Sequence, residues 1–106
     1  MKVTFYTTTS GRSPVLEYLR KLTKPEYAKI LEIFDQIEQY NFDVIGARFR
    51  QIESKLWEIK ILNHRVFYVV AEQNEMVILH AYKKQGQKLP RREYDVAIKR
   101  MKEVLL

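Results

Sequence analysis

Residues 56–82 carry the clearest strand pattern of the chain and read LWEIKILNHRVFYVVAEQNEMVILHAY. Apolar and polar side chains alternate in the first six residues, as is typical of a strand with one buried face. One face would carry Trp57, Ile59 and Ile61, and the other Leu56, Glu58 and Lys60. Arg65–Ala71 and Met76–Tyr82 are rich in β-branched and aromatic residues, and the polar segment Glu72–Glu75 is long enough for a hairpin. The stretch therefore predicts consecutive antiparallel strands.

The residues before this stretch predict one strand followed by two helices. Lys2–Thr7 has a strand pattern, and Ser13 followed by Pro14 is typical of a helix start. Thr23 and Glu26 form a capping box for a second helix, whose apolar residues recur every three or four positions to about Tyr40. Two helices in tandem indicate a helical hairpin.

The predicted fold is α+β in a single domain over residues 1–106. Arg48–Glu53 is a weaker strand candidate, and Pro90 opens a last helix that runs to the C-terminus. We expect an antiparallel sheet of about four strands, with an N-terminal helical hairpin and a C-terminal helix. The helices should cover one sheet face, and the other face, with Glu58, Lys60 and Arg65, should stay partly open.

The charge is concentrated near the C-terminus. The chain has 106 residues and a net charge of +6, and residues 83–106 contain 8 basic and 3 acidic side chains. A localised basic surface attracts nucleic acid or an acidic protein. With Cys 0, the chain has no disulfide, zinc–thiolate site or cysteine nucleophile. No apolar run approaches the roughly 18 residues of a membrane span, and the N-terminus lacks a signal-peptide pattern, so we expect a cytoplasmic protein.

Several kinds of chemistry lack the residues they need. The chain has no Gly-rich phosphate loop, no HExxH motif and no GxSxG motif. Its two histidines, His64 and His80, have no carboxylate or histidine at ligand spacing. We therefore expect neither a metal site nor a cofactor.

Basic and aromatic side chains nevertheless gather on the predicted sheet. They are Lys60, which shares a strand face with Glu58, and His64, Arg65, His80, Tyr82, Lys83 and Lys84. RNA can be cleaved without a metal because its 2′-OH is an internal nucleophile, which needs a base, an acid and a cation for the phosphorane. Candidate bases are Glu58 and His80, candidate acids are Lys83, Lys84 and His64, Arg65 suits the phosphate, and Tyr82 or Tyr68 suits base stacking. The same residues also fit ordinary surface and core positions.

Five segments resemble, in the right order, the motifs of a known family. Residues 54–60 (SKLWEIK) resemble a K-x-L-[YW]-E-[LI]-[RK] strand, residues 64–68 (HRVFY) a YR-[IV]-x-Y strand, and residues 78–84 (ILHAYKK) an [IL]-L-H-x-F-x-K-K segment. Residues 87–90 (QKLP) and 14–19 (PVLEYL) resemble its Q-K-T-P and P-V-x-E-[FY]-L motifs. These are motifs of the HigB-like toxins, the phage-derived branch of the RelE/ParE superfamily. The resemblance covers nearly the whole chain.

The resemblance implies the small RelE-like fold and the toxin of a type II toxin–antitoxin system. Such toxins generally cleave mRNA at the ribosome, and the antitoxin partner is typically a small helix-turn-helix protein. Carried over by position, Arg65, Lys60, His80 and Lys84 with Lys83 match family residues, and with Glu58 from the chemical argument they form the expected catalytic set. The expected substrate-binding residues are His64, Tyr82, Lys88, Arg91 and Arg92. His64 replaces the usual tyrosine, Tyr82 a phenylalanine and Leu89 a threonine, which leaves the acid and base roles open. Tyr94 corresponds to a RelE-type tyrosine but fits the apolar stripe of the last helix better.

Two other functions remain open at this point. A ParE-like toxin has the same fold and inhibits gyrase without cutting RNA, and a basic nucleic-acid-binding module needs no catalysis. The residues 80–84 and 87–90 favour the HigB-like branch.

Overall fold

A computed structural model describes residues 1–106 of the chain as five strands and three helices. In chain order they are β1 (Lys2–Phe5), α1 (Pro14–Arg20), α2 (Lys24–Tyr40), β2 (Arg48–Glu53), β3 (Leu56–Ile61), β4 (His64–Ala71), β5 (Glu75–Lys83) and α3 (Arg91–Leu105). The α+β class, the N-terminal helical hairpin and the C-terminal helix are confirmed. Arg48–Glu53 is a strand, as its weaker pattern indicated.

The sheet is larger than expected, and it is mixed. Its strand order is β1-β5-β4-β3-β2, and the β2–β5 meander is antiparallel throughout. β1 adds a fifth strand that pairs with β5 in parallel, with Lys2 opposite Glu75. A parallel pair needs a long connection between its strands, and here the helical hairpin and the meander supply it. The expectation of about four antiparallel strands holds for the meander but is wrong for β1.

Local sequence signals fix the starts of the first two helices. The Ser13 side chain accepts a hydrogen bond from the backbone N–H of Leu16 at the start of α1. Thr23 and Glu26 form the reciprocal capping box at the start of α2. Both arrangements satisfy backbone N–H groups that a helix leaves free at its first turn. Glu26 of this capping box also contacts His64 of β4.

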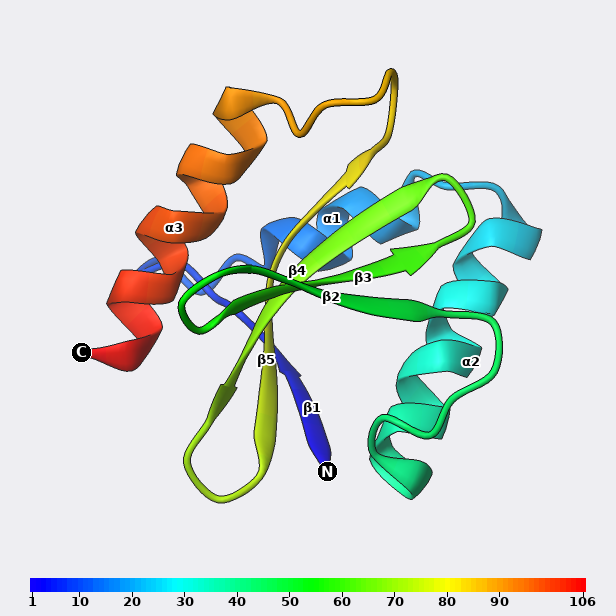
Figure 1. Ribbon diagram of the computed structural model, residues 1–106, viewed down its shortest axis with the longest axis horizontal. Coiled ribbons are helices and arrows are strands. Elements are labelled where there is room, and N and C mark those ends of the chain that lie inside the picture. Colours follow the sequence, from blue (N-terminus) through cyan, green and yellow to red (C-terminus); the bar gives the residue numbers. More distant parts are fainter.

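Helices cover both faces of the sheet, which corrects the expectation of one covered face. α1 and α2 pack on one face around a core that includes Leu19, Ile30, Ile59 and Val66. α3 packs on the other face through Ala97, against a smaller core that includes Leu56, Phe67, Val69, Val77 and Leu79. Figure 1 shows α3 separated from the helical hairpin by the strands. The reason is that β4 and β5 are apolar on both faces, so each face needs a helix to exclude water.

α3 leaves one end of its sheet face uncovered. The segment between β5 and α3 arches away from the sheet before α3 begins (Figure 1). The ends of β2, β3 and β4 near the β3–β4 turn therefore border an open groove.

None of the three helices has the length and hydrophobicity that a membrane span requires.

Candidate active site

Two rows of side chains cross the strands on the face that also carries α3. Because side chains alternate along a strand, residues in register on neighbouring strands share a face. The first row contains Arg48, Lys60, Arg65 and Tyr82. The second contains Arg50, Glu58, Phe67 and His80. The sheet thus places four cations from three strands beside one carboxylate.

An open groove of about 530 Å³ lies over the first of these rows. Its lining side chains are mostly charged: Arg48, Arg50, Glu58, Lys60, Arg65 and Lys84, together with Gly86 and Gln87 and one apolar residue, Phe49. We call this the basic groove. Its single carboxylate, Glu58, is buried and pairs with exposed Arg50 at 3.4 Å. An excess of cations over carboxylates gives the groove a positive potential that suits a polyanion.

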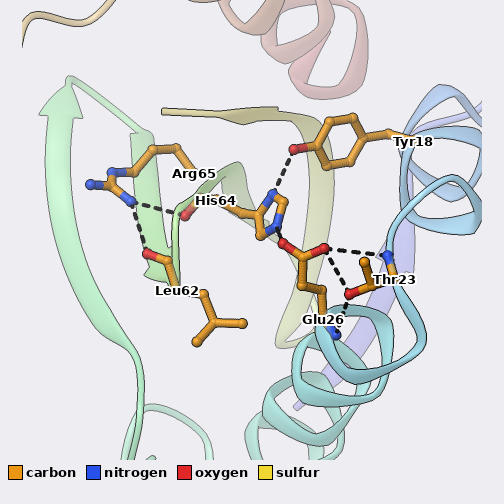
Figure 2. Close-up of polar contacts among 6 residues, drawn as sticks. All are labelled: Tyr18, Thr23, Glu26, Leu62, His64 and Arg65. Carbon is orange, nitrogen blue, oxygen red and sulfur yellow. Dashed lines mark hydrogen bonds and ion pairs between the residues drawn. The ribbon is translucent and has the colours of Figure 1, made fainter. Parts of the chain in front are cut away.

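Arg65 lies in the basic groove with only 8% of its surface exposed. Its Nη1 atom donates to the carbonyl oxygens of His64 at 3.1 Å and Leu62 at 3.5 Å (Figure 2). It takes part in none of the ion pairs of the structure. A buried guanidinium without a carboxylate is costly, and its remaining N–H groups are free to bind a phosphate.

Tyr82 lies beside Arg65 in the first row and is also buried. Its ring stacks on Phe67 with centroids 5.9 Å apart. Its hydroxyl has no hydrogen-bond partner, an unusual condition for a buried polar group. Burial, and then the charge of Glu58, raises the pKa of Tyr82, so the hydroxyl keeps its proton and can donate a hydrogen bond.

Comparisons with known proteins agree with this fold and layout. Residues 17–102 match the family described as "Phage derived protein Gp49-like (DUF891)". The chain belongs to this family. The crystal structure of the isolated E. coli RelE toxin is similar with a TM-score of 0.54 and 16% sequence identity, over 94% of this chain and 97% of that chain. Among curated proteins no match was found. The expected phage-derived family and the expected RelE-like fold are confirmed.

His80 of this Gp49-like protein lies beneath α3 and does not line the basic groove. Its Nε2 donates to Glu93 of α3 at 2.7 Å, and Arg100 lies 3.4 Å from its Nδ1. Burial is the main cause that lowers the pKa of His80. Both ring nitrogens contact side chains of α3, so the ring of His80 lies between helix and sheet and apart from the other candidates that line the groove.

His64 lies on the opposite face of the sheet from the basic groove. Its side chain is fully buried against α1 and α2, where it contacts Tyr18 and Glu26. In Figure 2 the side chains of His64 and Arg65 leave β4 in opposite directions. The structure therefore places the ring of His64 outside the basic groove and does not bring it together with Arg65, Lys60 and Lys84.

The remaining basic candidates divide into two groups. Lys60 and Lys84 line the basic groove, and Lys84 Nζ donates to the Gln87 carbonyl oxygen at 3.1 Å. The others are exposed and lie outside the groove lining: Lys83, Lys88, Arg91 and Arg92. Tyr94 packs against the smaller core, as its place in the apolar stripe indicated. No group of three or more His, Asp or Glu side chains is close enough to hold a metal ion.

Sequence reasoning missed two arginines of the site, Arg48 and Arg50. Both lie on β2 and line the basic groove. The signal was present, because Arg48, Phe49 and Arg50 alternate and so place both guanidinium groups on one face of a strand. It was overlooked because the strand itself was only weakly indicated. Gly86 and Gln87, which close the groove from the loop, have no comparable signal.

Proposed function

We propose that the chain is the toxin of a type II toxin–antitoxin system and cleaves mRNA on the translating ribosome. The observation that carries the proposal is Arg65, a buried guanidinium without a carboxylate partner on the floor of a basic groove. Membership of a phage-derived family and the RelE fold support the toxin assignment. The HigB-like motifs of the sequence favour the RNA-cleaving branch.

The chemistry is an internal transesterification of RNA. The 2′-oxygen forms a bond to phosphorus and the bond from phosphorus to the 5′-oxygen breaks, leaving a 2′,3′-cyclic phosphate and a 5′-OH. The proton of the 2′-OH passes to a base, and the departing 5′-oxygen takes a proton from an acid. No cofactor or redox partner enters this balance.

The groove residues divide these roles in the proposal. Arg65 and Lys60 stabilise the negative charge of the phosphorane. Glu58, the one carboxylate of the groove lining, accepts the proton of the 2′-OH. Lys84 supplies the proton to the 5′-oxygen. The exposed arginines of β2 hold the RNA backbone.

A partner protein belongs to the same proposal. The family resemblance implies a cognate antitoxin, a small protein with a helix-turn-helix domain. A partner that neutralises the groove must offer acidic side chains or block access to it, because the groove is cationic. Co-expression with such an antitoxin should restore growth.

The test is a map of mRNA 5′ ends after brief induction of the chain. We compare the wild type with Arg65→Ala and with Arg20→Ala, a control that removes an exposed arginine of α1 outside the groove. New ends inside translated frames should arise with the wild type and Arg20→Ala and be absent with Arg65→Ala. Growth arrest without new RNA ends would refute the nuclease and favour a gyrase-type toxin. Circular dichroism of each protein checks that it is folded.

A further inference from the structure

Three polar side chains, with buried His64 in the middle, form a chain of hydrogen bonds directly behind the basic groove. Tyr18 Oη lies 2.6 Å from His64 Nδ1, and His64 Nε2 lies 3.1 Å from a carboxylate oxygen of Glu26 (Figure 2). The three residues come from α1, β4 and the first turn of α2. His64 has no exposed surface. We call these residues the Tyr18–His64–Glu26 network.

An arrangement with Tyr18 as the donor gives each polar atom of the network a partner. Burial raises the pKa of Tyr18 to about 12, so its hydroxyl keeps its proton and donates to Nδ1. The opposite ring nitrogen, Nε2, then donates to Glu26. The bond from His64, and then the bonds from Thr23, lower the pKa of Glu26, which keeps this carboxylate ionised. Each polar atom has a partner, so the network has a single preferred geometry.

The backbone of the same residue holds the groove arginine. The carbonyl oxygens of His64 and Leu62 accept hydrogen bonds from Arg65 Nη1. Asn63, the other residue of the β3–β4 turn, accepts a 2.7 Å hydrogen bond from the backbone N–H of Lys84. The turn thus holds both Arg65 and the segment that carries Lys84.

Two buried side chains flank this turn, Ile61 and His64, and His64 is the one that hydrogen-bonds to the helices. Leu62 and Asn63 are exposed, and Leu62 has a positive φ of 53°. A non-glycine residue in this conformation is uncommon and requires support from its surroundings. The bonds from His64 to α1 and α2 supply that support across the sheet.

We propose that Tyr18, His64 and Glu26 are positioning residues that hold Arg65 at the phosphate-binding point of the basic groove. The inference rests on the proposed function for its catalytic consequence. Small displacements of a phosphate-binding group reduce catalysis strongly, because the geometry of the reacting atoms is lost. Their loss should therefore lower the rate of cleavage more than the affinity for RNA.

The first test follows the Arg65 side chain by ¹⁵N NMR relaxation of its Nε–H group and needs no RNA. Tyr18→Phe removes one oxygen of the network, and Tyr27→Phe is the matched control, since no hydrogen bond of the structure involves the Tyr27 hydroxyl. We expect an ordered Nε–H group in the wild type and the control. The order parameter should fall below about 0.6 in Tyr18→Phe. Equal order in all three proteins would overturn the inference.

A second variant covers the case in which Tyr18→Phe does not fold. Glu26→Gln keeps an acceptor for the capping box, where glutamine also serves, and the Glu26 side chain is partly exposed. It weakens the bond to His64 while it keeps an acceptor for Thr23, and it should release Arg65 in the same way. An Arg65 group as ordered as in the wild type would again contradict the inference.

A double-mutant comparison separates positioning from general damage. Tyr18→Phe should lower the single-turnover rate of cleavage by about tenfold and change the Kd for RNA by less than about twofold. In an Arg65→Lys background Tyr18→Phe should have almost no further effect on the rate, because the guanidinium that the network positions is absent. Equal losses in both backgrounds would refute positioning through Arg65. If no protein cleaves RNA, the proposed function fails, while the NMR signal still decides the inference.

Discussion

The two sides of β4 differ more than their sequence suggests. His64 and Arg65 are consecutive residues and both are buried, yet they face opposite sides of the sheet. On the side of α1 and α2, the ring of His64 has a hydrogen-bond partner for each nitrogen. On the groove side, Arg65 has no carboxylate and the Tyr82 hydroxyl has no partner. We infer that the hydrogen bonds of His64 stabilise the fold, whereas the guanidinium of Arg65 is available to bind a ligand.

The largest expected effect is the loss of cleavage in Arg65→Ala. Removing the group that stabilises the phosphorane should reduce single-turnover cleavage of RNA by about 10²–10³-fold. The free energy of unfolding should change by about 1 kcal/mol or less, because the packing lost is offset by the loss of an unpaired buried charge. Rapid-quench kinetics and urea unfolding measure the two quantities. If Arg65→Ala unfolds more easily but cleaves RNA normally, Arg65 stabilises the fold and does not act in catalysis.

His64→Ala should have the opposite balance. The substitution opens a cavity and leaves the Tyr18 hydroxyl and the Glu26 carboxylate without a partner. We expect the free energy of unfolding to fall by about 3 kcal/mol. Urea unfolding followed by tryptophan fluorescence, which reports Trp57, gives the value. A loss below about 1 kcal/mol would show that the network does not stabilise this side of the sheet.

Two tyrosine substitutions sharpen the comparison because each removes a single oxygen. Tyr18→Phe should lower the free energy of unfolding by about 1 kcal/mol, since it breaks a hydrogen bond. Tyr82→Phe should leave it unchanged or raise it by up to about 1 kcal/mol, since it removes a buried hydroxyl that has no partner. Equal destabilisation by both substitutions would mean that the Tyr82 hydroxyl has a partner in solution.

The smallest effect concerns salt. Five cations line the basic groove, so the logarithm of the RNA affinity should fall with the logarithm of salt concentration with a slope of about −3. Lys60→Gln should reduce the size of the slope by about 0.7, because one phosphate contact is lost. Arg20→Ala should leave it unchanged. Fluorescence anisotropy with a short RNA measures the slope, and a value near zero would argue against a phosphate-binding groove.

The sequence predicted what depends on local periodicity. The alternation in residues 56–61 placed Glu58 and Lys60 on one face and Ile59 in the core, as the structure has them. The placement of the two histidines could not be read in the same way. His64 contacts Tyr18 and Glu26, which are 46 and 38 residues away in the sequence. His80 contacts Glu93 of α3, a helix that was expected on the opposite face of the sheet. Such contacts depend on how the helices pack, which local patterns do not determine.

The most direct measurement uses ribosomes programmed with an mRNA that carries a single 2′-deoxynucleotide at a mapped cleavage position. The groove chemistry requires the 2′-oxygen as nucleophile, so the unmodified mRNA should be cut to a 2′,3′-cyclic phosphate and the modified one should stay intact at that position. Cleavage of the deoxy-substituted mRNA at the same bond would contradict the proposed mechanism.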